Sequence, residues 1–182
     1  NKLKKMRKAL IFGGQGQDGV IITNYLIKKK YKVISTSRKK EKKIINLSKN
    51  LIYKKCDISE SKKVFKIIKN FKPDEIYNFA AVSTIQQSEK SIINNDRINC
   101  FAILKIYEFL KKIKYKGKFF QSLSAEVFGN YNKAKQINFK QFNPQNPYAI
   151  AKLTSYFYSK YFKEKFNLKI YCGFFFNHDS IY

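Results

Sequence analysis

The stretch KALIFGGQGQDGVIITNYLI, residues 8–27, decides the fold of this chain. It opens with an apolar, strand-like run, continues with Gly13, Gly16 and Gly19 at intervals of three, and ends in an amphipathic, helix-like run. Glycine is otherwise scarce, since four of the seven glycines lie between positions 13 and 19. A strand that turns tightly into a helix needs such residues, and the helix N-terminus can receive a pyrophosphate. The context therefore predicts a dinucleotide-binding turn, although a glycine-rich turn can also be purely structural.

The rest of the chain alternates strand-like and helix-like segments. We expect strands near 8–13, 32–36, 51–55, 75–80, 117–123 and 169–175, and helices near 17–30, 60–71, 91–114 and 147–166. This order predicts an α/β fold: a doubly wound parallel sheet of the Rossmann type, with helices on both faces and ligands bound outside the carboxyl ends of the strands. No repeat or linker divides the chain, so residues 1–182 are expected to form one NAD(P)-binding domain.

A second group of residues, nearer the C-terminal end, can handle protons. Tyr148 and Lys152 are four apart on an expected helix and share one face of it, and an ammonium beside a phenol lowers the pKa of the tyrosine. Tyr148 is therefore a candidate base, although Tyr-x-x-x-Lys also arises by chance in a chain with 13 tyrosines and abundant lysine. Ser124 and Glu126 precede it in QSLSAEVFG, and simple alcohol oxidation would not need the carboxylate. Glu126 thus indicates a second proton abstraction in the same active site.

Cofactor preference should be set just after the second strand. An acidic side chain there would bind the ribose of NAD, whereas an arginine would accommodate the 2′-phosphate of NADP. The sequence reads Ser35-Thr-Ser-Arg38-Lys39-Lys40, without an acid. It favours NADP over NAD, although in a chain with a net charge of +26 an Arg-Lys pair can also be a part of the ordinary basic surface.

Taken together, these motifs resemble the extended short-chain dehydrogenase/reductase superfamily over the whole chain. The residues that carry the resemblance are Gly13-x-x-Gly16-x-x-Gly19, Asp57, Ala80-Ala81 and Tyr148-x-x-x-Lys152. Within the superfamily, the strings GGQGQDG, DEIYNFAAVS, SAEVFG, NPYAIAK and FFNHDS are most similar to the GDP-mannose 4,6-dehydratase family, and the Asn177-His178 pair is the sharpest match. The chain departs from the family at Ser124-Ala125-Glu126, where Thr-Ser-Glu is usual, at Val127-Phe128-Gly129, where Leu-Tyr-Gly is usual, and after Asn99, where a glycine is missing.

The resemblance implies a sugar-nucleotide 4,6-dehydratase that forms GDP-4-keto-6-deoxymannose from GDP-mannose by internal hydride transfer through NADP. It implies that Tyr148, assisted by Lys152, removes the C4 hydroxyl proton, that Glu126 takes the C5 proton, and that Ser124 hydrogen-bonds the C4 oxygen. The implied cofactor-binding residues are Gly13, Gly16, Gln17, Asp18, Gly19, Arg38, Asp57, Ile58, Ala80, Ala81, Tyr148 and Lys152, and the implied substrate-binding residues are Ser83, Glu126 and Asn177. For Asp57 a helix cap is the alternative.

Other functions stay open at this point. An NAD(P)-dependent epimerase or reductase for a nucleotide sugar would share the glycine turn and the Tyr148-Lys152 pair but would not need Glu126. A dehydratase for a dTDP-, CDP- or UDP-hexose would differ only in the base it recognises. A non-catalytic dinucleotide-binding protein with a decayed site is disfavoured, because all four proton-handling side chains are present.

Length and ends suggest a fragment. Family members are considerably longer and continue past the equivalent of FFNHDS into a smaller lobe that holds much of the sugar nucleotide. Because the chain begins with Asn1 and stops at Tyr182, we expect that this substrate-binding lobe is missing, which puts the activity of the isolated piece in doubt. The full-length protein is expected to be a homo-oligomer.

The net charge of +26 raises nucleic-acid binding as a rival function. The lysines are spread over all segments in short runs instead of one patch, which predicts a solvated surface and no nucleic-acid partner. Cys56, Cys100 and Cys172 are widely spaced and the chain has one histidine, so no metal site is expected. The first apolar run breaks at Gly13 and no run reaches the ~20 residues of a spanning helix, so we expect a cytoplasmic protein without membrane contact.

Overall fold

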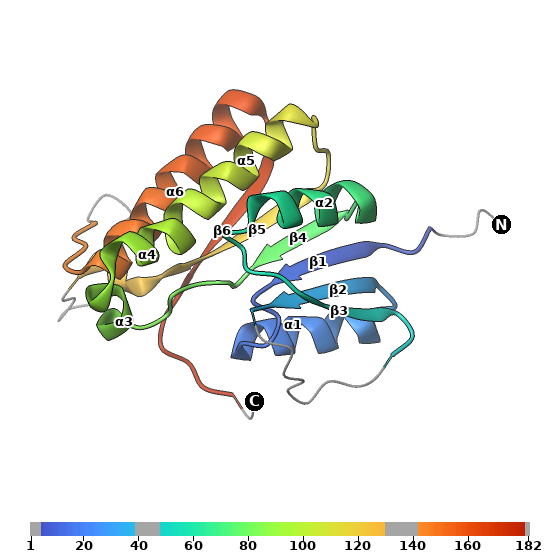
Figure 1. The fold of residues 1–182 in the computed structure, drawn as a ribbon, viewed down its shortest axis with the longest axis horizontal. Coiled ribbons are helices and arrows are strands. Elements are labelled where there is room, and N and C mark those ends of the chain that lie inside the picture. The colour runs from blue at the N-terminus through green and yellow to red at the C-terminus, as the bar shows by residue number, and fades with distance from the viewer. Residues whose placement is uncertain (1–4, 39–47, 130–141, 181–182) are drawn as a thin grey trace.

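Six parallel strands form one sheet in the order β3-β2-β1-β4-β5-β6 in the computed structural model, which describes residues 5–38, 48–129 and 142–180 (Figure 1). The strands are β1 (Lys8–Phe12), β2 (Lys32–Ser37), β3 (Leu51–Lys55), β4 (Glu75–Asn78), β5 (Lys118–Ser124) and β6 (Lys169–Phe175). The chain winds outward from β1 in one direction to β3 and in the other, through β4, to β6, so the order reverses between β1 and β4. The predicted doubly wound parallel sheet is confirmed, and ligands of such sheets bind at this reversal.

Helices connect the strands. They are α1 (Gln17–Lys28), α2 (Ser61–Phe71), α3 (Ile85–Lys90), α4 (Ile92–Asp96), the π-helical η1 (Arg97–Phe101), α5 (Ala102–Lys112), the 3-10 helix η2 (Ala125–Phe128) and α6 (Pro147–Phe166). The helix expected over 91–114 is therefore interrupted by a π-helical turn, in which the Ala102 N–H donates to the Arg97 carbonyl five residues earlier. Helix α3 was not expected, because its polar sequence IQQSEK has no apolar periodicity and depends on the Thr84 cap.

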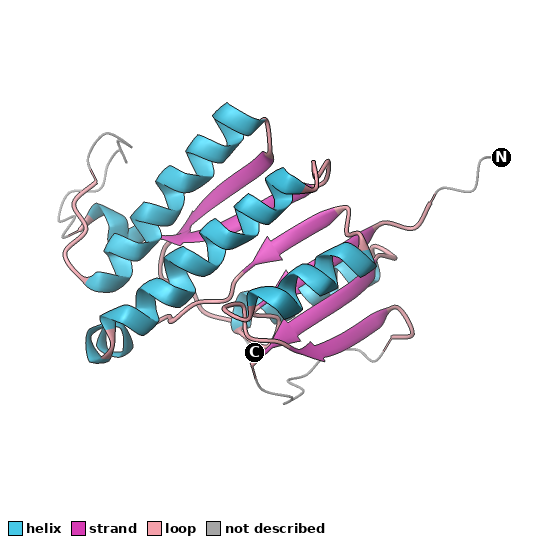
Figure 2. Ribbon diagram, turned by 45° about the horizontal axis from the view of Figure 1, so that its top comes forward, coloured by secondary structure: helices cyan, strands magenta, loops and turns pink. Residues whose placement is uncertain are grey.

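The two faces of the sheet are covered unequally (Figures 1 and 2). Helices α2, α5 and α6 pack on one face, where Leu10, Phe12 and Phe119 belong to the larger core. Helix α1 packs on the other face against Ala9 and Ile11. The prediction of helices on both faces is confirmed. Apolar burial on both faces stabilises a parallel sheet.

The half of the α1 face that lies over β4, β5 and β6 is rich in aromatic rings. Phe120 lies within 5.7–6.2 Å, centroid to centroid, of the rings of Tyr77, Phe79 and Phe175. Tyr171 on β6 is 50% exposed. Among the helices in the described ranges, α1 is the only one on this face of the sheet, and it packs against β1. The aromatic half of the face, over β4, β5 and β6, is therefore turned outward.

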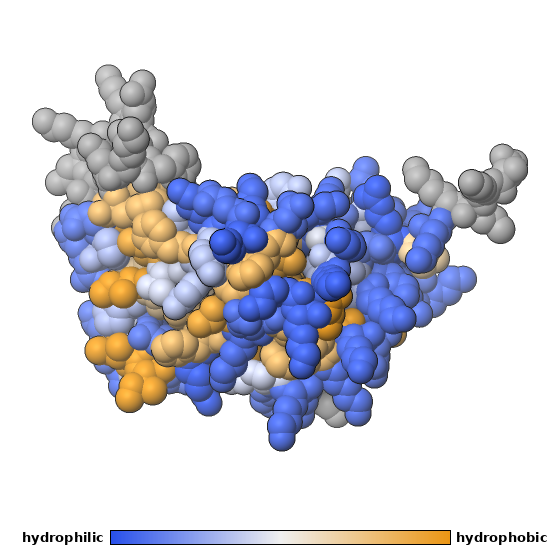
Figure 3. Space-filling view, turned by 90° about the horizontal axis from the view of Figure 1, so that it is seen from above, coloured by the Kyte–Doolittle hydropathy of each residue, from blue (hydrophilic) through white to orange (hydrophobic). Residues whose placement is uncertain are grey.

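The outer surface of the α4–α6 side combines lysines with apolar side chains. Figure 3 shows apolar groups gathered toward the end of the molecule where α4 and the start of α6 lie, while hydrophilic groups cover much of the rest. Exposed apolar residues of these helices include Ile93 at 84% and Ile150 at 51%. No helix in the described part of the chain is long and apolar enough to cross a bilayer.

Candidate active site

One cavity of about 1140 Å³ opens at the carboxyl ends of the strands, where the order of the sheet reverses. Its walls come from the turn after β1, the ends of β2 and β3, the loop after β4, the end of β5, helix α6 and the segment after β6. All residues predicted from the sequence to bind cofactor or substrate, or to act in catalysis, line it: Gly13, Gly16, Gln17, Asp18, Gly19, Arg38, Asp57, Ile58, Ala80, Ala81, Ser83, Ser124, Glu126, Tyr148, Lys152 and Asn177. The fold therefore brings them together, and their individual roles stay predictions.

The glycine turn forms one wall of the cavity. Its backbone lies so close to neighbouring backbone that Gly13 and Gly19 have no room for a side chain. Gly13 has a φ of +75°, and a Cβ atom built on it would lie 2.6 Å from the Phe79 carbonyl carbon. A Cβ atom on Gly19 would collide with the Gly13 carbonyl oxygen. The turn is closed by the Gly16 N–H, which donates to the Gly13 carbonyl at 3.0 Å. The result is a tight strand-to-helix turn that leaves the N-terminus of α1 facing the cavity, where a pyrophosphate can bind.

Two residues predicted to contact the cofactor lie at the ends of β2 and β3. Arg38 directly follows β2 and is exposed at the rim of the cavity, while Lys39 and Lys40 lie outside the described residues. Asp57 follows β3, and its Oδ1 accepts hydrogen bonds of 2.8 Å from both the N–H and the hydroxyl of Ser59. The N-cap of α2 is Glu60, so Asp57 does not cap that helix.

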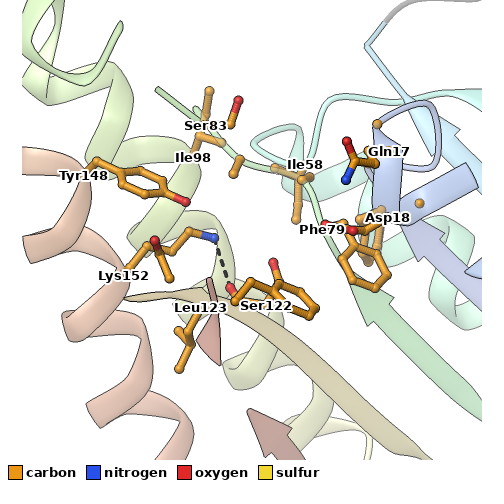
Figure 4. Close-up of a pocket in the computed structure, with 18 of the residues that line it drawn as sticks. Gln17, Asp18, Ile58, Phe79, Ser83, Ile98, Ser122, Leu123, Tyr148 and Lys152 are labelled. Atoms are coloured by element: carbon orange, nitrogen blue, oxygen red, sulfur yellow. Dashed lines mark hydrogen bonds between the residues drawn. The ribbon is translucent and has the colours of Figure 1, made fainter. Parts of the chain in front are cut away.

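Tyr148 and Lys152 extend from the first two turns of α6 into the cavity (Figure 4). The Lys152 Nζ lies 5.7 Å from the centre of the Tyr148 ring and donates a hydrogen bond of 2.9 Å to the Ser122 carbonyl. Lys152 is only 2% exposed, and this burial lowers its pKa to about 8. The two side chains share a helix face as predicted, but the ammonium is aimed at a carbonyl of β5 rather than at the phenol.

The prediction that Lys152 lowers the pKa of Tyr148 was wrong for this arrangement. Burial raises the pKa of Tyr148, a hydrogen bond with Ser124 partly offsets the rise, and the Glu126 carboxylate adds to it. The physical reason is that desolvation of the phenolate and a nearby like charge raise this pKa, while the ammonium is directed at the Ser122 carbonyl and is not among the groups that shift it. Tyr148 is therefore a neutral phenol whose hydroxyl forms a hydrogen bond with Ser124.

Glu126 is held by contacts that join β5 to α6. Ser124 caps η2, since its hydroxyl accepts from the Glu126 N–H at 3.3 Å. The Glu126 Oε2 accepts from the Asn146 side-chain amide at 3.4 Å, and the Asn146 Oδ1 caps α6 by accepting from the Ala149 N–H at 2.8 Å. Asn146 was not predicted as a site residue, although an asparagine before a proline at the first helical position is a recognisable helix start. Its two contacts place the carboxylate beside the helix that bears Tyr148.

The segment after β6 crosses to the glycine turn. The His178 Nε2 pairs with the Asp18 Oδ1 at 2.7 Å, and the Gln17 side-chain amide donates to the His178 carbonyl at 3.0 Å. The His178 Nδ1 lies 2.7 Å from the Phe176 carbonyl oxygen. This carbonyl and Asp18 raise the pKa of His178. The contacts bring Asn177 to the rim of the cavity next to the first turn of α1.

We expect the His178 pKa, measured by NMR, to lie above the ordinary 6.5. Asp18→Asn should lower this pKa but leave it above 6.5. The Phe176 carbonyl is the larger cause and persists in the variant. The charged form, and with it the full contact to Asp18, is present below about pH 6.5 and is lost as the pH rises through the raised pKa. Because the chain has one histidine, the titration has one resonance to follow. A parent value at or below 6.5 would show that the contact does not form in solution.

The reversed parallel sheet, the glycine turn and a tyrosine and lysine on one helix face define a Rossmann-fold protein of the extended short-chain dehydrogenase/reductase class. Residues 10–182 match the family described as GDP-mannose 4,6 dehydratase. The chain belongs to this family, which confirms the resemblance seen in its sequence.

Individual relatives agree with this assignment. The chain is 28% identical over 190 residues to the GDP-mannose 4,6-dehydratase of Yersinia enterocolitica, covering 96% of this chain and 50% of the relative. It is 31% identical over 193 residues to GDP-mannose 4,6 dehydratase of Homo sapiens, covering 97% and 51%. Among solved structures, UDP-N-acetylglucosamine 4-epimerase from Methanobrevibacter ruminantium, in complex with UDP-N-acetylmuramic acid, superposes with a TM-score of 0.81 at 26% identity, covering 93% and 54%. The chain thus spans about half the length of the curated relatives it matches.

Proposed function

We propose that the protein to which this chain belongs is a GDP-mannose 4,6-dehydratase that uses NADP and forms GDP-4-keto-6-deoxymannose. The observation that carries the proposal is the Glu126 carboxylate, which lines the same cavity as Tyr148 and Lys152 and is held there by Asn146. An alcohol oxidation needs one base, whereas elimination of water across C5 and C6 needs a second acid–base group. The membership of the family supports the same assignment.

The residues of the cavity fit a dinucleotide. Side chains at Gly13 or Gly19 would collide with neighbouring backbone, so glycine at these positions allows the tight turn that brings the N-terminus of α1 to the cavity, where a pyrophosphate would bind. Arg38 would hold a 2′-phosphate, Asp57 and Ile58 would contact the adenosine part, and Ala80 and Ala81 would let the cofactor pass. When bound, an oxidised nicotinamide would supply the acceptor for a hydride from C4 of the sugar, the donor that returns it to C6, and a positive charge in the site.

The protein's own groups then move the protons. Tyr148 would act as a phenolate, which the Lys152 ammonium and the positive charge of the bound cofactor would stabilise against the burial that raises its pKa. The phenolate would take the C4 hydroxyl proton, with Ser124 hydrogen-bonded to the C4 oxygen. Glu126 removes the proton at C5, which the 4-keto group has made acidic, and protonates the departing C6 hydroxyl. Ser83 and Asn177, both exposed at the rim, would contact the sugar nucleotide. A carboxylate suits the second role because it both accepts and returns a proton near neutral pH.

A nucleotide-sugar 4-epimerase is the second candidate, because the epimerase of M. ruminantium has the same fold at 26% identity. The two reactions differ in whether water is lost. The complete protein should therefore be incubated with NADP and separately with GDP-, dTDP-, CDP- and UDP-hexoses. The products should be separated by chromatography, which resolves epimers of equal mass, and weighed by mass spectrometry, which detects the loss of water. Loss of water from GDP-mannose alone supports the proposal, whereas turnover of a UDP-hexose without loss of water would assign an epimerase.

We further propose that the complete protein continues beyond this domain into a substrate-binding lobe and acts in the cytoplasm as a homo-oligomer. The length of the relatives supports the additional lobe. The exposed Ile93 and Ile150 are compatible with an apolar contact between copies. Sedimentation of the preparation used for the assay tests the oligomer, and a monomer at assay concentration would refute it.

We expect NADPH to bind the complete protein more tightly than NADH, and Arg38→Asp to reverse or abolish that preference. The exposed guanidinium at the end of β2 would pair with the 2′-phosphate, and an aspartate would repel it. Fluorescence titration of both reduced cofactors measures the ratio of the two Kd values. Lys32→Asp, at the other end of β2, makes the same charge change away from the cavity and should leave the ratio unchanged. Equal affinities in the parent would refute the assignment of NADP.

A further inference from the structure

Two fully buried asparagines lie where α4 passes into the π-helical turn η1. Asn95 is 0% exposed and Asn99 is 1% exposed. They are four residues apart, and the Asn99 amide donates to the Asn95 Oδ1 at 2.7 Å. Buried amides are costly unless their hydrogen-bonding groups find partners, so the remaining contacts of the pair indicate what they hold together.

Asn99 reaches the loop after β4. Its amide also donates to the Val82 carbonyl at 3.0 Å, and its Oδ1 accepts from the Val82 N–H at 3.0 Å. This two-way contact fixes the backbone between Ala81 and Ser83, which lie in the wall of the cavity. One side of the pair is therefore tied to a wall that would contact the cofactor.

Asn95 reaches the other wall, at the start of α6. Its amide donates to the Pro147 carbonyl at 3.0 Å and to the Asp96 Oδ1 at 2.9 Å. Pro147 is the first residue of α6 and directly precedes Tyr148. Two turns further along α6, the buried Ser155 hydroxyl donates to the Asn99 carbonyl. The stretch of α6 that bears the proposed catalytic tyrosine and lysine is thus anchored at both ends by asparagines of one segment.

We propose that Asn95 is a positioning residue, which acts through Pro147 to hold Tyr148 at its working distance from Ser124 and Glu126. This role rests on the proposed function of the cavity. The Asn95 amide is buried and has no access to a ligand, so its effect on the reaction passes through the backbone of α6. Its loss removes the bond to Pro147 and leaves the Asn99 amide without one of its acceptors.

Small displacements at this place matter because Tyr148 depends on two neighbours from another element. Its pKa responds to the hydrogen bond with Ser124, the last residue of β5, and to the charge of Glu126 in η2. The helix that carries the tyrosine must therefore keep its register against β5. A misplacement of about 1 Å can cost about 10²-fold in rate.

The test compares Asn95→Ala and the milder Asn95→Ser with the parent in the complete protein. We expect Asn95→Ala to lower kcat roughly 10- to 100-fold, to leave the Kd of NADPH within about threefold, and to shift the pH profile of kcat/KM. The ¹³C resonance of the Tyr148 ring, assigned by its absence in Tyr148→Phe, should move as well. This resonance reports on the position of Tyr148 whatever sugar nucleotide the protein uses, so the inference and the proposed function can fail separately.

A purely structural role is the rival, and the buried Val64 in α2 supplies its control. Val64→Ala removes apolar contacts of a core residue that does not line the cavity, and it should lower Tm without moving kcat, the pH profile or the Tyr148 resonance. If Asn95→Ala behaves like Val64→Ala in all of these measurements, the proposal is overturned. Should Asn95→Ala fail to fold, the same measurements on Asn95→Ser decide, and parent-like values there overturn it equally.

Discussion

Glu126→Gln is expected to slow elimination of water by about 10²–10⁴-fold in the complete protein, because it removes the acid–base group while keeping its size. A glutamine can still accept from the Asn146 amide through its own carbonyl, so the contact that joins η2 to α6 is retained. Tyr148 and Lys152 keep their places, and oxidation at C4 should continue. The variant should therefore accumulate reduced cofactor, incorporate little solvent deuterium at C5 and release little 4-keto-6-deoxy product.

The control for this experiment is Tyr148→Phe, which should block the earlier step and accumulate no reduced cofactor. The two variants then separate the roles of phenol and carboxylate within one cavity. Near-normal elimination by Glu126→Gln would mean that another group takes the C5 proton and that the carboxylate is only a structural partner of Asn146. Absorbance of the reduced cofactor and mass spectrometry of the sugar nucleotide measure the two outcomes.

Sequence reasoning was strongest where one residue type had one physical use. Glycine at positions 13 and 19 has such a use, because the turn there leaves no room for a Cβ atom. The strand-like runs were recognised for a similar reason, since a parallel sheet buried on both faces requires continuous apolar segments. The rule that the carboxyl ends of such strands meet at one edge predicted where a ligand binds. The predicted site residues, many of them taken from the family resemblance, line the cavity at that edge.

What the sequence could not supply were contacts between distant segments and the directions of side chains. Asp18 and His178 were each part of a recognised motif, but their pairing across 160 residues depends on the path of the chain after β6. The spacing of Tyr148 and Lys152 places both on one helix face but does not say where the ammonium points. That direction depends on the Ser122 carbonyl of β5, a partner from another element.

The π-helical turn is a further case of this kind. Its residues Arg97–Phe101 continue a helical pattern in the sequence, and the extra residue per turn becomes visible only with its hydrogen bonds. Asn95 and Asn99 are polar residues in the middle of what the sequence predicts as one helix, and asparagines there are usually expected on the protein surface. Their burial is explained by the two cavity walls that they hold, which the sequence does not bring together.

Lys152 should make the stability of the protein depend on pH in a direction opposite to that of an ordinary paired lysine. Its pKa is about 8 in the folded state, below the ordinary 10.5, because the ammonium is buried. Between these values the unfolded chain binds a proton that the folded chain does not, so the free energy of unfolding rises with pH across this window. The separation corresponds to about 3 kcal/mol. Below pH 8 the folded protein carries the charge at a cost.

Lys152→Met isolates this effect, because methionine fills similar space without a charge. Unfolding by urea at about pH 7.5 and about pH 10 should show the parent gaining roughly 2–3 kcal/mol relative to Lys152→Met as the pH rises. Buried tyrosines such as Tyr107 have raised pKa values and titrate in both proteins, so their contribution cancels in the comparison. Lys160→Met, on an exposed position of the same helix, should show no such change. If the parent and Lys152→Met differ by the same amount at both pH values, the ammonium is not desolvated, and the position of Lys152 in the wall of the cavity would have to be revised.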